Sequence, residues 1–412
     1  MTSRLMLAMA VASALFALPL HAAQPLQAAR GTDQVAPRVE RAPMPDATVE
    51  RAPMPDATVE RVPVRFAWAL DPTRALSAPA PFVALSRSYW DTVDAATLQR
   101  GLELPLTAPD AVIQVSPVQG ARALEVEQLQ VRDPSGALAL DKVVDAQQLR
   151  AAGMGVGEGS AMARTGASTA VGTYRLQAAQ AQGRYVVQVL EPNSPIALTL
   201  QADRQQVLAG GSVLLNARLQ HDGGNAARAA GRSAARTLPA GGEALLVAPD
   251  GRSWPVPLVA GKDGLRAQVT IPEDVGQAQG LWELQAFVTA QGVQRDAKVA
   301  FAVARPTARF SGQVEVDAAR RQVRLPLQIG APGRYEARGT LHATGPDGRL
   351  HPVAQAHSAA WFDAAGAGEL LLAFDTVALP GGYGAPFELR DLQLQDQGRM
   401  APIESRAVAV RF

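Results

Sequence analysis

The sequence predicts a mainly β protein, in which a mixed α+β N-terminal domain is followed by two tandem immunoglobulin-like β-sandwiches. From residue 196 onward, short segments that alternate apolar and polar residues are separated by Gly, Asp and Pro turns, the pattern of antiparallel strands. A Pro-Asp-Gly-Arg turn followed by Pro-Val occurs twice, and its prolines at 249 and 346 are 97 residues apart. That spacing is close to the length of one sandwich. Two short segments before residue 196 carry the signals of a helix.

The N-terminus is predicted to be a signal peptide that spans residues 1–23. Arg4 is followed by an apolar run from Leu5 to Leu20, and Ala22 and Ala23 supply the small residues of a cleavage site. The run is short for a membrane span, although a retained N-terminal anchor helix is the alternative. The chain has no cysteine, so a lipid anchor on cysteine and disulfide bonds are both excluded. We expect a periplasmic or secreted protein, cleaved near Ala22 or Ala23, whose mature chain has no membrane span.

Residues 24–61 are predicted to form a disordered linker rich in proline and alanine. The decapeptide RAPMPDATVE occurs twice in tandem, at 41–50 and 51–60, without a substitution. A packed core could not absorb such a duplication, because every later contact would shift. The segment also lacks apolar periodicity, and its prolines favour an extended chain. We interpret it as a spacer; in the alternative, each decapeptide is a docking motif and two copies provide avidity.

A mixed, mostly β domain with two short helices is expected over residues 62–195. Its first segment, 62–70, alternates apolar and polar residues as a half-buried strand does. Asp94 and Asp145 each precede a helical segment as N-cap residues, and a glycine follows each segment as a stop signal. The segments between and after these helices are expected to be strands.

The two sandwiches are expected over residues 196–304 and 305–412. A Gly-x-aromatic motif, whose ring enters a core near a corner and whose polar tip reaches the backbone, occurs three times. Its aromatic residues are Tyr185, Trp282 and Tyr335. An insertion over residues 221–242 interrupts the first sandwich, and it carries three arginines spaced by four, which are Arg228, Arg232 and Arg236. That spacing would suit an anion, but we expect a flexible loop without a partner.

Composition and motifs exclude several classes of function. Lys and Arg number 39 against 38 Asp and Glu, for a net charge of +1, so the chain lacks the basic field that nucleic acids require. His342, His351 and His357 fall close together, but not at a spacing typical of zinc ligands. The glycine-rich segment 153–160 lacks the lysine of a phosphate loop. We therefore predict no catalytic, cofactor-binding or metal-binding residue, and no cofactor.

Four residues near the first predicted helix are the main candidates for a site. Tyr89, Trp90, Asp91 and Asp94 combine two aromatic rings with two carboxylates in a short segment. Such a cluster could line the active site of an enzyme, or the contact surface of a protein that acts like a protease inhibitor. In the alternative interpretation, a carboxylate caps the helix and the tryptophan packs into a core.

Trp254 and Trp361 are the candidates for carbohydrate binding. Both lie near the start of a predicted strand, where an exposed ring could stack on a sugar. Trp282 lies inside an alternating strand and is expected in the core. Because two isolated rings make a small platform, carbohydrate binding is the lesser hypothesis.

Three segments carry a resemblance to a known family. They are "SYWDTVDAATLQRG" at 88–101, "GRYVVQVLEPNSPIALTLQADRQQVLAGGSVLLNARL" at 183–219 and "PFELRDLQLQD" at 386–396. The chain resembles an uncharacterised family of exported proteobacterial proteins, known only as a domain of unknown function. The resemblance implies a mixed N-terminal domain followed by immunoglobulin-like domains, and it assigns no catalytic residues. The decapeptide repeat and the insertion are not features of that family.

These features predict an exported, non-enzymatic envelope protein that acts as a binding or structural module. The modular β architecture and the lack of a catalytic motif support this interpretation. The alternatives are an enzyme or protease-inhibitor-like protein with its site in the mixed domain, and a carbohydrate-binding protein. The expected partner is an envelope protein or a polysaccharide, and not a nucleic acid.

Overall fold

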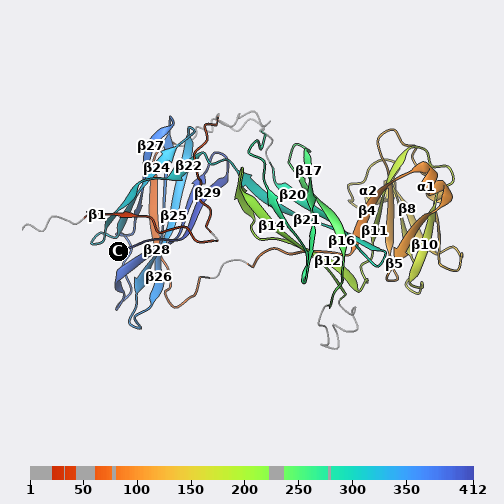
Figure 1. Ribbon diagram of the computed structural model, residues 1–412, viewed down its shortest axis with the longest axis horizontal. Coiled ribbons are helices and arrows are strands. Elements are labelled where there is room, and N and C mark those ends of the chain that lie inside the picture. The colour runs from red at the N-terminus through yellow and green to blue at the C-terminus, as the bar shows by residue number, and fades with distance from the viewer. Residues whose placement is uncertain (1–20, 32, 43–60, 77–79, 222–235, 277–279) are drawn as a thin grey trace, which may run out of the picture. The chain divides into compact units, whose positions relative to one another are not determined.

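The computed structural model describes residues 21–31, 33–42, 61–76, 80–221, 236–276 and 280–412. They form a mainly β structure with two short α-helices, as the sequence predicts (Figure 1). The chain divides into two compact units. The central unit is Pro79–Val303, and the terminal unit combines the residues before and after it. Neither helix of the described ranges has the length and apolar character that a membrane span needs.

The first half of the central unit is a mixed module with two antiparallel sheets. Its elements are β4 (Ser88–Asp94), α1 (Ala95–Arg100), β5 (Leu102–Leu106), β6 (Val112–Pro117), a 3-10 helix (Val126–Gln128), β7 (Gln130–Arg132), β8 (Leu140–Asp145), α2 (Ala146–Ala151), β9 (Ala161–Thr165), β10 (Gly172–Gln177) and β11 (Arg184–Leu190). One sheet has the order β4-β11-β6-β9-β8 and the other β5-β10-β7. Apolar side chains from both sheets and from α1 share one core, which includes Leu98, Ile113 and Leu176.

Both helices begin where the sequence predicts. The Thr97 N–H donates to the Asp94 carboxylate at 2.7 Å, and the Gln148 N–H donates to that of Asp145 at the same distance. These bonds satisfy backbone donors that have no partner inside a helix. Gly101 ends α1 with a φ of 102°, a conformation that glycine adopts without strain.

The second half of the central unit is a β-sandwich. Its strands are β3 (Ala84–Ser86), β12 (Ile196–Ala202), β13 (Gln206–Leu208), β14 (Ser212–His221), β15 (Arg236–Thr237), β16 (Gly241–Val247), β17 (Ser253–Pro257), β18 (Val259–Gly261), β19 (Gly264–Thr270), β20 (Trp282–Ala290) and β21 (Val293–Ala304). One sheet has the order β18-β19-β14-β12-β3, with β15 on β14, and the other β13-β21-β20-β16-β17. Leu200 and Leu215 of the first sheet share a core with Leu284 and Phe301 of the second.

The terminal unit is a second sandwich. Its strands are β1 (His21–Pro25), β2 (Val64–Ala69), β22 (Ala308–Phe310), β23 (Gln313–Asp317), β24 (Gln322–Ile329), β25 (Gly333–Thr344), β26 (Leu350–Phe362), β27 (Gly366–Ala373), β28 (Gly384–Asp396) and β29 (Ala401–Arg411). One sheet has the order β1-β23-β24-β22, with β27 on β24, and the other β2-β26-β25-β28-β29. Gly339 lies where the sheets face each other, because a Cβ there would fall within 3.0 Å of Leu389 and Leu372.

The strand expected at 62–70 forms as β2, but it joins a different domain from the one predicted. β2 pairs with β26, for example Phe66 with His357, so it belongs to the terminal unit and not to the mixed module. β3 also lies in the range expected for the mixed domain, yet it pairs with β12 of the sandwich. Alternation along a strand defines its two faces but not its pairing partner, which is why the sequence pattern misplaced both strands.

Residues 21–42 are not a disordered segment, in contrast to the linker predicted over 24–61. β1 pairs with β23 along all five of its residues. The Gln34 side-chain amide donates to the carbonyl oxygens of Pro402 and Ile403 at 3.0 and 2.9 Å. A segment without apolar periodicity can still bond its backbone to the edge of a sheet, and its composition does not reveal this.

Three predicted segments lie wholly or mostly outside the described residues. They are residues 1–20 of the signal peptide, residues 43–60 of the decapeptide repeat and residues 222–235 of the insertion. Arg228 and Arg232 fall in the last of these segments, whereas Arg236 lies in β15.

The Gly-x-aromatic motif places its rings as the sequence predicts. The Tyr335 hydroxyl donates to the Ala331 carbonyl at 2.8 Å, and the Tyr185 hydroxyl donates to the Arg122 carbonyl at 2.7 Å. Both tyrosines and Trp282 are buried. The burial of Tyr335 raises the pKa of its phenol to about 12. The motif therefore marks side chains that join a core to the backbone at a corner.

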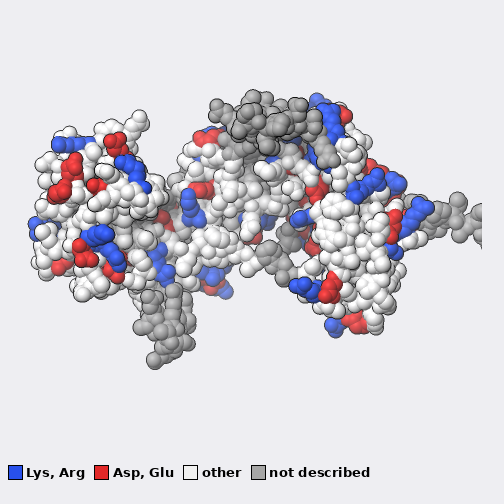
Figure 2. All heavy atoms as spheres, turned by 180° about the vertical axis from the view of Figure 1, so that it is seen from behind, with Lys and Arg blue, Asp and Glu red and all other residues white. Residues whose placement is uncertain are grey.

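Charged side chains of both signs mix on the surface. On the face drawn in Figure 2, Lys and Arg lie among Asp and Glu over both units. This arrangement agrees with the net charge of +1. Local groups of charge, and not a general field, are therefore the place to look for recognition on this face.

Candidate functional site

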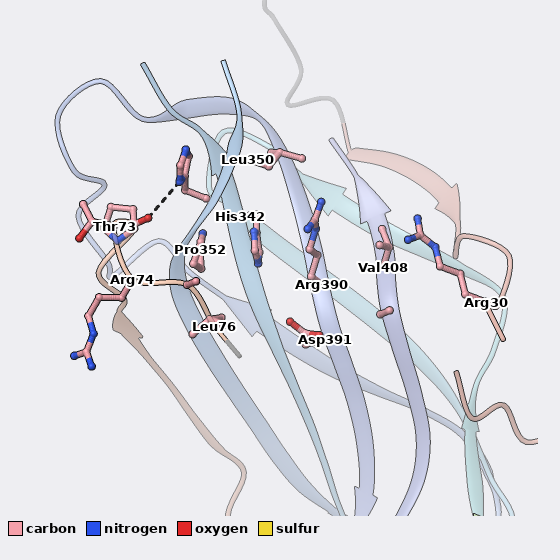
Figure 3. Close-up of a pocket in the computed structure, with 14 residues that line it drawn as sticks. Arg30, Thr73, Arg74, Leu76, His342, Leu350, Pro352, Arg390, Asp391 and Val408 are labelled. Carbon is pink, nitrogen blue, oxygen red and sulfur yellow. Dashed lines mark hydrogen bonds between the residues drawn. The ribbon is translucent and has the colours of Figure 1, made fainter. Parts of the chain in front are cut away.

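A hollow of about 620 Å³ lies on the outer face of the sheet that contains β25 and β28. Figure 3 shows four strands contributing side by side: Pro352 from β26, His342 from β25, Arg390 from β28 and Val408 from β29. We call it the sheet hollow. Residues 72–76 border it on one side and Arg30 on the other. Its full lining is Arg30, Pro72, Thr73, Arg74, Ala75, Leu76, His342, Leu350, His351, Pro352, Arg390, Asp391, Ala407 and Val408.

His342 is the central polar group of the sheet hollow. Its side chain is only 7% exposed, and neither ring nitrogen has a hydrogen-bond partner within the described residues. Burial, together with the positive charge of Arg390, lowers the pKa of His342 to about 4, although the charge of Glu388 and the Leu350 backbone act in the opposite direction. The imidazole is therefore neutral at pH 7 and offers one donor and one acceptor. Buried polar groups are nearly always paired, so His342 is a candidate contact for a ligand.

Arg390 is held beside His342 by a buried carboxylate. Its Nε donates to Glu388, which is fully buried and also accepts from Arg411. Burial alone would raise the pKa of Glu388, but the bonds from Arg411 and Arg390 outweigh it and lower that pKa. Because only Nε of Arg390 is used within the described residues, the two terminal nitrogens of its guanidinium remain available to a ligand.

A second arginine reaches the hollow from an N-terminal segment. The Arg30 side chain extends toward Val408 in Figure 3, and it makes no hydrogen bond within the described part of the chain. Asp33 fixes this segment, because its carboxylate accepts from the Arg30 N–H and from the Ala407 N–H, both at 2.8 Å. The backbone of Arg30 is thereby tied to β29, while its guanidinium is left free.

The opposite wall is a turn that follows β2. The Thr73 N–H and hydroxyl both donate to Asp71, at 2.9 and 2.6 Å, and they lower the pKa of its carboxyl. The ring of His351 lies against this turn, with Nδ1 3.2 Å from the Pro72 carbonyl and Nε2 2.9 Å from Asp347. His351 therefore has a partner at each nitrogen, in contrast to His342. Arg74 lies at the rim, and its guanidinium points away from His342 in Figure 3.

The charges and shape of the sheet hollow suit a small organic anion. Three arginines and one aspartate, Asp391, are the ionised residues of its lining. Buried Pro352 and Val408 supply an apolar floor. A carboxylate could bond the guanidinium of Arg390 with both oxygens, while its apolar part lies over that floor.

Three of the four candidate residues predicted near the first helix come together, but they do so away from the sheet hollow. Tyr89, Trp90 and Asp91 line a second hollow, of about 430 Å³, in the central unit. Asp94 is not among its lining residues and caps α1. The Thr92 N–H donates to Asp91 at 2.7 Å, while Trp90 is 41% exposed. The N-cap interpretation is thus right for Asp94, and the core interpretation is wrong for Trp90.

Trp254 and Trp361 do not lie as open rings. Trp254 stacks on buried Trp282 with 5.6 Å between ring centroids, and the Arg252 guanidinium covers it at 5.6 Å. The Arg61 guanidinium covers Trp361 at 5.0 Å. More exposed rings occur on both units: Trp90 on the central unit, and Phe66 and Trp68 of β2 on the terminal unit, where they group with the ring of His357.

Sequence reasoning missed the residues of the sheet hollow. His342 drew attention only as one of three neighbouring histidines. The structure separates their roles, because His357 stacks with rings of β2 while His351 orders a turn. Within the described residues no cluster of His, Asp and Glu could hold a metal ion. Arg390 comes close to His342 only because β25 pairs with β28, and no sequence signal indicated that pairing.

Comparisons with known proteins identify the family. The model of the N-terminal domain of DUF4785, a domain of unknown function, matches residues 55–191, and that of its C-terminal domain matches residues 307–412. Together the two matches span more than half of the chain. No curated protein matches the sequence.

A solved structure of this family shares the fold. A DUF4785 family protein from Legionella pneumophila superposes with a TM-score of 0.66 at 17% sequence identity, over 92% of this chain and 99% of its own. Salmonella alpha-2-macroglobulin reacted with methylamine reaches a TM-score of only 0.26 at 15% identity, over 73% of this chain and 21% of its own. The family matches and the shared fold confirm the resemblance found in the sequence, and the chain belongs to the DUF4785 family.

Proposed function

We propose that this protein is an exported, non-enzymatic binding protein that holds a small organic anion in the sheet hollow. One observation carries the proposal: in the part of the chain that the structure describes, a buried histidine whose two ring nitrogens lack partners lies beside an arginine whose guanidinium is held through Nε alone. An unsatisfied buried polar group costs about 1–3 kcal/mol. A ligand that bonds His342 would remove that cost, and this gain would make the free energy of binding more favourable.

The expected ligand combines a carboxylate with an apolar body. Arginine binds planar oxyanions with two parallel hydrogen bonds, and a neutral imidazole can donate a third. Arg30 adds charge from the other side of the hollow. Export is supported by the N-terminal pattern of Arg4, an apolar run and small residues at 22 and 23. Carbohydrate binding at Trp254 and Trp361 stays a prediction.

The histidines provide the test, because the full chain has only five. Histidine labelled with carbon-13 at Cε1 gives one signal each, and H342Q identifies that of His342. Benzoate should shift this signal, whereas benzamide, which has the same shape without the charge, should not. R390Q should weaken benzoate binding about tenfold, the equivalent of about 1.4 kcal/mol.

Arg338→Gln is the matched control for Arg390→Gln. Arg338 lies on the outer face of the same sheet and bonds Gln393 at 2.6 Å, but it does not line the hollow. Its substitution should leave benzoate binding unchanged. An unmoved His342 signal, or an equal shift with benzamide, would refute the proposed anion site.

A further inference from the structure

The second hollow lies where β4 of the mixed module meets the sandwich of the central unit. We call it the joint hollow. Glu243, Phe287 and Asp296 form one row across β16, β20 and β21, because Phe287 pairs with both of the others. The Trp90 ring meets Phe287 edge-on at 5.5 Å between ring centroids, and the backbone N–H of Trp90 donates to the Asp296 carboxylate at 2.7 Å. An aromatic pair thus lies between two carboxylates.

A buried ion pair fixes this joint. Arg295 and Glu191 are fully buried at their side chains, 2.5 Å apart. Arg295 also donates to the hydroxyls of Ser194 and Thr107, at 2.9 and 3.1 Å, and to the Ile196 carbonyl at 3.1 Å. These bonds link the sandwich to the mixed module, so the walls of the joint hollow keep their spacing. Ligand sites in proteins are often found where modules meet.

The joint hollow has an excess of negative charge. Asp91, Glu243 and Asp296 line it together with Arg295, whose charge is already paired with Glu191. Glu243 has no hydrogen bond or ion pair within the described residues, and Asp91 accepts only from the neighbouring Thr92 N–H there. Burial raises the pKa of Asp296 to about 6, so this carboxyl is ionised at pH 7 and above.

A buried phenol adds an independent sign of a ligand. Tyr89 is 6% exposed, lines the joint hollow, and its hydroxyl has no partner within the described residues. Burial raises the pKa of this phenol, so it stays neutral and can accept a hydrogen bond from an N–H donor. A buried hydroxyl that is left unpaired is rare in proteins.

We propose that the joint hollow binds an organic cation, through the ammonium or guanidinium group of a basic side chain or small amine. Glu243 and Asp296 would bond its N–H groups from two sides, and the Tyr89 hydroxyl would accept a further bond. The exposed face of Trp90 would attract the charge through its π-electrons. This ligand differs in sign from that of the sheet hollow, and it binds to the other unit.

The five tryptophans of the full chain provide the test. Labelled with 5-fluorotryptophan, the protein gives one fluorine signal for each, and W90F identifies that of Trp90. At pH 8, N-acetylarginine amide should shift the Trp90 signal, whereas N-acetylcitrulline amide, its uncharged analogue, should not. D296N and E243Q should each raise the dissociation constant about tenfold.

D263N is the matched control. Asp263 lies between β18 and β19 in the same sandwich, outside the joint hollow, and pairs with Arg266. Its loss should leave binding unchanged. Methylguanidinium distinguishes the sources of the cation: weaker binding than N-acetylarginine amide indicates a side chain in a peptide, and equal binding a small amine. The proposal is overturned if the citrulline analogue shifts the Trp90 signal as much as the arginine compound does. It is also overturned if D296N, E243Q and D263N have the same dissociation constant.

Discussion

At the scale of single residues, His342 and Tyr89 share one feature, which is a buried polar group without a hydrogen-bond partner within the described residues. Each is more than nine-tenths buried. The buried hydroxyls of Tyr185 in the central unit and Tyr335 in the terminal unit, by contrast, each donate to a backbone carbonyl. Within the described residues, buried atoms of Gln34, Gln128 and Arg321 also lack a partner. His342 and Tyr89 differ from these because they line the two hollows, where a ligand could bond them.

The histidine makes the terminal unit sensitive to acid. The pKa of His342 is about 4 in the folded protein, below its ordinary value of 6.5. As the pH falls from 6.5 to 4, the unfolded chain binds a proton that folded His342 does not, so the free energy of unfolding falls. The slope is about 1.4 kcal/mol per pH unit. Urea unfolding at several pH values should show this loss in the wild type but not in H342Q, and parallel curves would contradict it.

At the scale of elements, Arg295 of β21 joins the sandwich to the mixed module through hydrogen bonds. It extends from β21 and bonds groups on both sides of the segment that joins β11 to β12. R295M would leave Glu191 buried without its partner, which should lower the free energy of unfolding by about 3–5 kcal/mol. Urea unfolding followed by tryptophan fluorescence measures this change.

R266M is the control for R295M, since Arg266 lies on β19 of the same sandwich and is about half exposed in its pair with Asp263. A change within about 0.5 kcal/mol is expected there. The double variant E191Q/R295M should recover part of the stability that R295M loses, because no buried charge then remains. An R295M protein as stable as R266M would show that the ion pair does not hold the joint.

Local elements could be predicted from the sequence, but their partners could not. Asp94 and Asp145 cap helices as expected because a cap depends on residues three positions away. The strand at 62–70 could also be predicted, because the alternation of apolar and polar residues is a property of neighbouring positions. Its pairing with β26, nearly 300 positions later, depends on which sheet edges are open in the folded chain.

The candidate sites depend on the same distant pairings. Arg30, the turn at 72–76, His342 and Arg390 meet in one hollow although they span most of the chain. No spacing in the sequence could indicate this. Tyr89, Trp90 and Asp91 were found because they are adjacent, yet the carboxylates that complete their hollow come from β16 and β21.

The whole molecule should unfold in two steps, because each compact unit has a core of its own. Calorimetry of the full chain should show two transitions. R295M should lower only that of the central unit, and Y335F, which removes the bond to the Ala331 carbonyl in the terminal unit, should lower only the other. One transition that shifts with both variants would show that the units are a single cooperative structure.

The pairing of β1 with β23 has a consequence for the order of events after synthesis. β1 spans His21–Pro25, so cleavage after Ala23 would remove three of its five residues. In the processed chain only Gln24 and Pro25 would remain paired with β23, so most of β23 would change from an inner strand to the edge of its sheet. Removal of the leader would be a step in shaping the terminal sandwich as well as in releasing the protein.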